Sequence, residues 1–235
     1  MMFADHTTSA FDADMRNLWR LLTDMGALAE RQVAHAIKAL ATGDRAIARE
    51  VVEEDAAVDS MQRTIDERVV ETIARRQPVA VDLRDVLGIL RIAAELERIG
   101  DLAKNIGKRI LAINGEDLIN GSTRGLTHMS LAMLGQLRDV LASLAQRDVK
   151  MAIEVWARDE DVDRLCTRLS REFVGRMRQD PGALAFGVHL LFCTKNLERM
   201  GDHATNIAEA VYYMVEGRRL IGERPKADVT SMATT

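Results

Sequence analysis

The chain has 235 residues and a formal net charge of −4, and 47% of its residues are apolar whereas only 4% are aromatic. Its 32 basic and 36 acidic residues are interspersed, which argues against the basic face of a nucleic-acid-binding protein. Only three prolines and almost no runs of alternating β-branched residues indicate helices rather than strands. We therefore predict an all-α protein, whose length suits one large domain or two small ones.

Six long helices are predicted from the spacing of apolar residues. Leu18, Leu22 and Met25, for example, fall on one stripe of a helix. Asp44 and Asp148 each precede such a stretch and are predicted N-caps. The predicted helices cover residues 15–42, 44–76, 82–114, 123–146, 148–178 and 182–216. The tails, residues 1–11 and 222–235, are predicted to be disordered.

These helices divide into two repeats. The two N-cap aspartates lie 104 residues apart, and Pro78 and Pro181 lie 103 apart, each after a long amphipathic stretch. A polar, glycine-rich segment at 115–125 separates the halves. Since short connections make successive helices antiparallel neighbours, we predict two tandem up-down-up three-helix bundles, at residues 12–117 and 120–218.

The sequence also bears on the location of the protein and on its thiols. Residues 1–16 lack the pattern of a secretory signal peptide, and no apolar run reaches the roughly 18–20 residues that a spanning helix needs. We expect a soluble, cytoplasmic protein. Cys166 and Cys193 match neither a zinc site nor a disulfide framework, so two buried thiols are expected.

One eleven-residue segment occurs twice. Residues 96–106 read L-E-R-I-G-D-L-A-K-N-I and residues 197–207 read L-E-R-M-G-D-H-A-T-N-I, with eight of the eleven positions identical. Each copy keeps a Glu, an Asp four residues later and an Asn four residues after that. Because residues four apart on a helix share a face, both copies direct carboxylates the same way.

The preceding helix of each half supplies matching carboxylates. Asp55 lies 23 residues before Pro78 and Asp101 lies 23 after it, whereas Asp59 and Glu97 each lie 19 residues away. In an antiparallel hairpin, equal distance from the turn means equal height. The second half repeats this pattern around Pro181. Each hairpin should therefore bring two carboxylate pairs together, Asp55 and Asp59 with Glu97 and Asp101, and Asp159 and Asp163 with Glu198 and Asp202.

Four close carboxylates repel one another unless a positive charge lies among them. Oxygen-only ligands suit hard cations such as magnesium, calcium, manganese or oxidised iron, with zinc as a further candidate. Asn105 and Asn206 could each add a carbonyl ligand or hold a carboxylate in place by a hydrogen bond. The alternative is that these are solvated faces, with Glu97 and Glu198 paired to neighbouring arginines. Duplication and matched height favour a cation site.

The glycine that precedes the Asp in each copy has two interpretations. Gly100 and Gly201 each cost a helix about 1 kcal/mol relative to Ala, so either a ligand or backbone approaches closely there, or the helices simply pack tightly.

We find no phosphate-binding loop, no Glu-x-x-His di-iron motif and no nucleophile elbow in the sequence. A non-enzymatic protein is expected.

With these motifs in place, the chain resembles the PhoU family, the regulatory accessory proteins of bacterial phosphate ABC transporters. The resemblance covers residues 11–217 and includes the L-E-R-[IM]-G-D pair, the D-x-x-x-D of each preceding helix, and Asp82-Leu83-Arg84 at the start of the third helix. The second half has Ala183-Leu184-Ala185 instead of the last motif, which implies that the two halves differ in affinity or in partner contacts.

The resemblance implies metal clusters, with iron or zinc in some members, and negative control of phosphate-starvation signalling. The implied partners are the transporter ATPase, a membrane sensor histidine kinase and a second copy of the chain, with the membrane reached only through partners. Carried over by motif, the metal ligands are Asp55, Asp59, Glu97, Asp101, Asp159, Asp163, Glu198 and Asp202. Alternative functions are a metal-dependent phosphohydrolase or metal store, and a metal-free helical scaffold.

Overall fold

The structure, a computed structural model, describes residues 2–113 and 124–222. All regular elements in these two ranges are helices, which confirms the predicted all-α class. They are α1 (Met2–Thr42), α2 (Arg45–Arg76), α3 (Ala80–Ala112), α5 (Arg124–Gln146), α6 (Val149–Ala157), α7 (Asp159–Gln179), the 3₁₀ turn η1 (Pro181–Ala183) and α8 (Leu184–Glu216). Most of the predicted join at 115–125 and of the predicted C-terminal tail lies outside the described residues.

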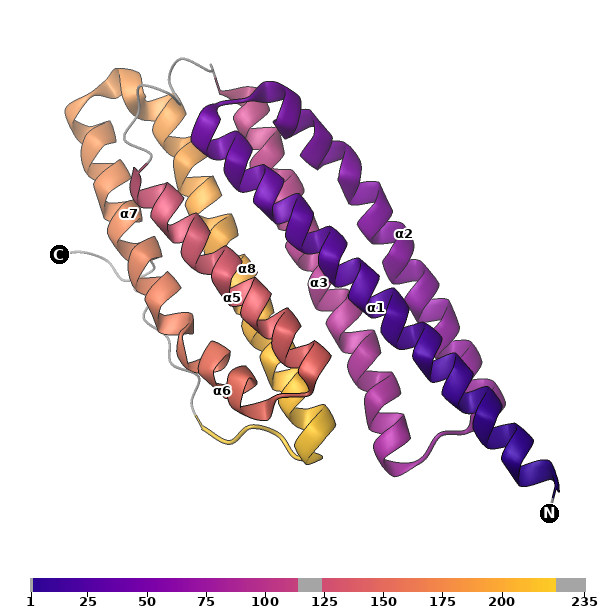
Figure 1. The fold of residues 1–235 in the computed structure, drawn as a ribbon. Helices are drawn as coiled ribbons and strands as arrows, with labels where there is room; N and C mark the ends of the chain where they lie inside the picture. The colour runs from indigo at the N-terminus through magenta and orange to yellow at the C-terminus, as the bar shows by residue number, and fades with distance from the viewer. Residues whose placement is uncertain (1, 114–123, 223–235) are drawn as a thin grey trace.

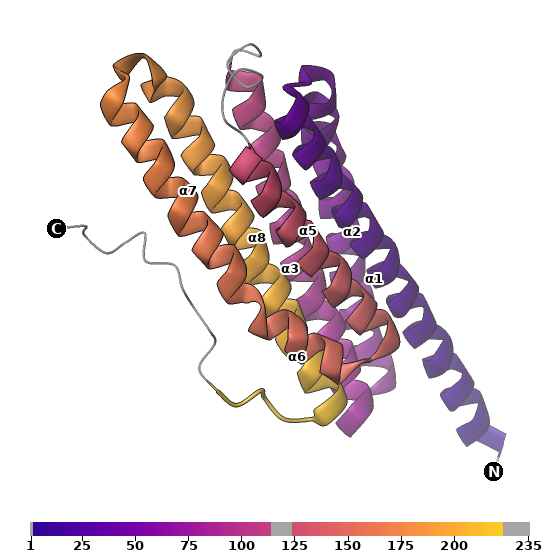
Figure 2. The ribbon, with the colours of Figure 1, turned by 60° about the vertical axis from the view of Figure 1, so that its left-hand side comes forward.

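Two antiparallel bundles lie side by side. Helices α1, α2 and α3 form the first bundle, and α5, the pair α6 and α7, and α8 form the second (Figure 1). Helices α3 and α8 pack against each other along the middle of the molecule, about as extensively as α2 packs on α3 (Figure 2). The helices that carry the repeated segment are therefore the ones that join the two halves.

The predicted N-caps are confirmed. The Asp44 side chain accepts hydrogen bonds from the backbone N–H of Ala46 (2.8 Å) and Ile47 (3.3 Å). The Asp148 side chain accepts from Lys150 (2.9 Å) and Met151 (3.1 Å) in the same way. Such a cap satisfies amides that have no partner within the helix and is worth about 1 kcal/mol. The same local chemistry thus starts the second helix of each half.

Three helix boundaries differ from the predictions. Helix α1 begins at Met2, so residues 2–11 are helical rather than a disordered tail, because neither Gly nor Pro interrupts the chain before Gly26. The predicted helix 148–178 is broken at Arg158, where three acidic residues, 159–161, form the first turn of α7. Acidic residues favour the positive end of the helix dipole, which accounts for a new N-terminus there. The turn after Pro181 is 3₁₀, and α8 begins at Leu184.

The core follows the predicted apolar stripes. Leu18, Leu22 and Met25 are fully buried, and Met129 in the second half is buried at the position that corresponds to Met25. Both cysteines, Cys166 and Cys193, are buried, as predicted. Burial raises the pKa of the Cys193 thiol to about 12, so this cysteine stays protonated at neutral pH.

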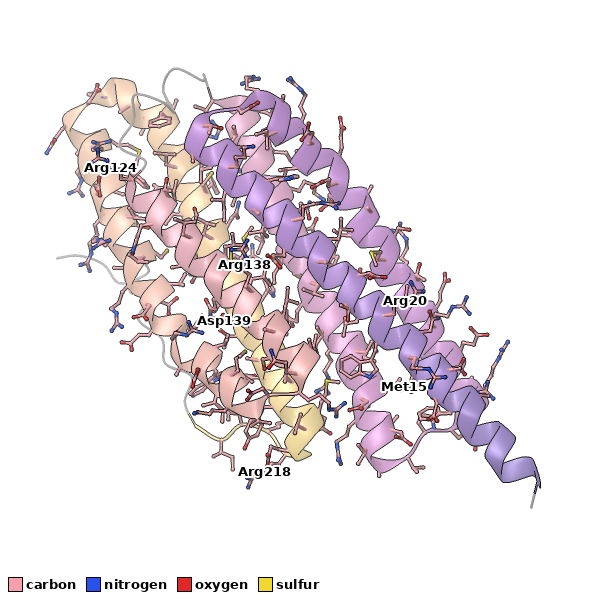
Figure 3. All side chains as sticks on the ribbon, viewed as in Figure 1. Met15, Arg20, Arg124, Arg138, Asp139 and Arg218 are labelled. Carbon is pink, nitrogen blue, oxygen red and sulfur yellow. The ribbon has the colours of Figure 1, made fainter. Side chains whose placement is uncertain are left out.

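Polar contacts add to the packing between the halves. The guanidinium of Arg138, on α5, donates from Nε to Glu30 Oε1 of α1 at 2.7 Å (Figure 3). Arg147 makes a bidentate pair with Asp85 of α3 at 2.8 and 2.9 Å. In the α3–α8 interface, Glu95 Oε2 lies 2.6 Å from His203 Nδ1. Of these contacts, the one between Glu95 and His203 joins α3 directly to α8 and so helps to set the relative height of the two acidic hairpins.

Candidate functional site: two acidic hairpins

The first hairpin brings the predicted carboxylates together. Lys104 Nζ donates to Asp55 Oδ2 at 2.5 Å and to Asp101 Oδ1 at 2.6 Å, so α2 and α3 place these two aspartates at the same height. Asp55 is 5% exposed, and its Oδ1 accepts no hydrogen bond from the described residues. The prediction that Asp55 lies level with Asp101 is confirmed, and a lysine that the sequence analysis did not consider lies between them.

The pKa of Glu97 responds to the other carboxylates of the first hairpin. Desolvation raises the pKa of Glu97, Arg98 lowers it, and the negative charges of Asp101, Asp59 and Asp55 raise it further. Arg98 Nε lies 3.5 Å from Glu97 Oε2, which is the arginine pairing expected under the solvated-face alternative. The carboxylates of the first hairpin are therefore near enough to influence one another, and their charge is partly balanced by Arg98 and Lys104.

Lys104 is held as a cation. Desolvation lowers the pKa of Lys104, but hydrogen bonds to Asp101 and Asp55, together with their charges, outweigh that effect and leave the pKa well above its usual value. A raised pKa means that the stabilisation from the charged lysine is complete below its unfolded-state pKa and is lost only as the pH rises through the higher folded-state pKa. At neutral pH the ammonium is fully present.

The carboxylates of the second hairpin are more deeply buried. Asp159, Asp163 and Glu198 are each at most 5% exposed, whereas Asp202 is half-buried. Thr205 Oγ1 donates to Asp159 Oδ1 at 3.1 Å, and Lys195 Nζ donates to Glu198 Oε1 at 2.7 Å. Glu198 is thus paired with Lys195, three residues earlier on the same helix. Burial of this degree is unusual for acidic residues unless they are paired or bind a cation.

Two buried glutamines complete these hairpins, and the sequence analysis missed them. An ideal Cβ at Gly100 would lie 2.9 Å from Gln32 Oε1, and one at Gly201 would lie 3.3 Å from Gln136 Oε1. Both glutamines are buried, and neither Oε1 accepts a hydrogen bond from the described residues. The repeated glycine is therefore explained by close packing against a glutamine of the first helix of each half. The signal was available, because the two glutamines lie 104 residues apart.

The two asparagines lie differently from the expectation. Asn206 Nδ2 donates to Glu95 Oε2 of α3 at 3.1 Å, so its amide belongs to the interface between the halves, and Asn105 is exposed. The reason is the helical period of 3.6 residues, since eight positions after the Glu of the motif a side chain has drifted about 80° round the helix.

The two hairpins are not equally suited to binding a metal ion. Among residues 2–113 and 124–222, no three His, Cys, Asp or Glu side chains converge closely enough to hold an ion as they stand. In the first hairpin an ammonium already lies between Asp55 and Asp101. In the second, Thr205, a neutral hydroxyl, stands at the position of Lys104, where it donates to Asp159 Oδ1 and accepts from Gln136 Nε2. The oxygen-only chemistry of the second set suits a hard cation.

The chain is an internally duplicated all-α protein of two three-helix bundles. Each bundle has an acidic hairpin, and the bundles are joined through α3 and α8. The family model described as "PhoU domain" matches it twice, at residues 22–110 and 126–211. The chain belongs to the PhoU family.

Individual relatives match over nearly their whole length. The phosphate-specific transport system accessory protein PhoU homolog of Rhizobium meliloti (strain 1021) is 46% identical over 226 residues, which are 96% of this chain and 95% of the relative. The crystal structure of PhoU from Pseudomonas aeruginosa superposes with a TM-score of 0.84 at 36% identity, covering 88% of this chain and all of that one. The phosphate transport system regulatory protein PhoU from Streptococcus pneumoniae gives a TM-score of 0.83 at 27% identity, covering 90% and 99%.

No helix in the described part of the chain is long and apolar enough to cross a membrane.

Proposed function

We propose that this chain is the accessory protein of a phosphate-specific transport system and a negative regulator of phosphate uptake and of phosphate-starvation signalling. It acts as an adaptor between the ATPase of the phosphate ABC transporter and a membrane sensor histidine kinase. It works in the cytoplasm as a homodimer and reaches the membrane through these partners. The observation that carries the proposal is the match to accessory proteins of that name over nearly their full length.

The chemistry of the chain supports an adaptor rather than an enzyme. Its strongest nucleophiles are the two thiols, and both are buried, with the pKa of Cys193 raised to about 12 by desolvation. A thiol must ionise to attack, so Cys193 is not suited to catalysis. Lys104 and Lys195 form ion pairs with Asp55 and Glu198 of these hairpins. An adaptor needs only its outer helical faces, whereas the acidic hairpins can tune the shape or stability of each bundle.

We further propose that the acidic hairpin of the second half binds a metal cation, with iron, manganese, magnesium or zinc as candidates. The second hairpin would hold it through Asp159, Asp163, Glu198 and Asp202. A bound cation would supply the positive charge that neutralises these carboxylates, and the residues themselves orient the oxygens and exclude water through burial. The role of the cation here is to stabilise the bundle.

Deleting the gene tests the regulatory role. In phosphate-rich medium, alkaline phosphatase activity is expected to rise from the repressed level to that of phosphate-starved cells, and a plasmid copy should restore repression. Activity that stays at the repressed level after deletion would refute the role of negative regulator. Turnover of phosphoesters by the purified protein, lost in a Glu198→Gln variant, would instead favour the metal-dependent hydrolase.

A further inference from the structure

The two copies of the eleven-residue segment differ at one position that faces the carboxylates. Lys104 in the first copy corresponds to Thr205 in the second. The two side chains hydrogen-bond equivalent aspartates. Lys104 Nζ donates to Asp55, and Thr205 Oγ1 donates to Asp159, which is the corresponding residue of the second half. One hairpin thus places an ammonium where the other places a neutral hydroxyl.

We propose that Lys104 is the resident cation of the first hairpin and closes its carboxylates to metal ions. This inference builds on the proposed cation binding, but it concerns the first hairpin alone. The Lys104 ammonium lies within 2.6 Å of carboxylate oxygens from both α2 and α3. A metal ion that used the same two carboxylates would lie against that ammonium, and charges of the same sign at such a distance repel strongly in a partly buried site.

The position of Lys104 makes it hard to displace. Its side chain is 21% exposed and starts on α3, three residues after Asp101, so the stem is anchored beside the carboxylates that it bridges. Lys195, which contacts Glu198 in the second hairpin, is 46% exposed. The more exposed Lys195 can move its ammonium toward solvent more easily than Lys104, which is enclosed between Asp55 and Asp101.

Removing the charge should convert the first hairpin into a cation site. Lys104→Met keeps the length of the stem but leaves Asp55, Asp101 and Glu97 facing one another with less positive charge. Without metal, this variant should melt about 5–10 °C below the wild type. With Mn²⁺ added, its melting temperature should return toward that of the wild type, because an ion that binds only the folded state stabilises it.

Metal content gives the second measurement. Elemental analysis after equilibration with Mn²⁺ and removal of the free ion should show about one more ion per chain in Lys104→Met than in the wild type. Lys104→Arg keeps the charge and should gain none. Lys108→Met removes an exposed lysine one turn along the same helix and should match the wild type in both measurements.

The outcomes separate this inference from the proposed cation binding. An extra ion in Lys104→Met with Mn²⁺-dependent recovery supports the role of Lys104, even if the wild type itself binds none. Equal metal content in the wild type and Lys104→Met overturns it, whether the common value is zero or not. If Lys104→Met is unfolded without metal, folding on addition of Mn²⁺, followed by circular dichroism, supports the inference and failure to fold with Mn²⁺ contradicts it.

Discussion

Replacing Thr205 with Val is expected to lower the stability of the protein by about 2–3 kcal/mol, because one hydroxyl serves two buried polar groups. Thr205 Oγ1 donates to Asp159 Oδ1 at 3.1 Å, with the Gly201 carbonyl as a second acceptor at 3.0 Å. It also accepts from Gln136 Nε2 at 3.2 Å. Valine has nearly the same shape, so the expected loss comes from hydrogen bonding and not from a cavity.

The measurement is thermal or urea unfolding followed by circular dichroism. For a chain of this size the loss corresponds to a fall in melting temperature of about 4–12 °C. Thr194→Val is the matched control, since Thr194 is also fully buried in α8 but its hydroxyl donates to Leu190 O of its own helix. That variant should lose less than about 1 kcal/mol. Equal losses in the two variants would show that the Asp159–Thr205–Gln136 contacts add nothing.

The close crossing of α2 and α3 gives the second large effect, at Gly107. An added Cβ would lie 3.0 Å from the backbone carbonyl oxygen of Ala48, 3.2 Å from Val52 Cγ2 and 3.4 Å from Val51 Cγ1. A backbone oxygen inside a helix has little room to move. Gly107→Ala should therefore cost about 1–2 kcal/mol, the balance of overpacking against the better helix propensity of alanine.

Gly135 provides the control for this substitution. It lies inside α5, and a Cβ there would meet nothing within 4 Å, so Gly135→Ala should stabilise the protein by up to about 1 kcal/mol. Opposite signs for the two glycines are expected in urea unfolding. A stabilising Gly107→Ala would mean that α2 and α3 lie further apart than the structure shows. Ala208 already stands at the corresponding position of the second half, so the close crossing is a property of the first hairpin.

Local chemistry explains which parts of the fold could be predicted from the sequence. The caps at Asp44 and Asp148 depend on a side chain and the backbone two or three residues away, and both were predicted. The alignment of Asp55 with Asp101 follows from helical geometry and a short turn, and it was predicted by counting residues from Pro78. The break at Arg158 was missed because helix propensity is high on both sides, and only the acidic residues after it signal a new start.

The parts of the site that were missed depend on contacts between helices. Gln32 and Gln136 lie on the first helix of each half, and their approach to Gly100 and Gly201 depends on how three helices are rotated about their axes. The sequence does not specify these rotations directly. Lys104 was not predicted as part of the site because it lies at a position where the two copies differ. At this position the first copy has the ammonium of Lys104 and the second has the hydroxyl of Thr205, and this difference distinguishes the two hairpins chemically.

Complementation with variants of the second hairpin tests most directly the central claim, that the regulatory role proposed for this protein needs the carboxylates of that hairpin. A deletion strain would carry either the wild-type gene or a Glu198→Gln Asp202→Asn double variant, with alkaline phosphatase measured in phosphate-rich medium and folding checked by circular dichroism. We expect the folded variant to leave the enzyme activity at the level of the deletion strain, because the carboxylates that would hold the cation are gone. Full repression by that variant would contradict the claim.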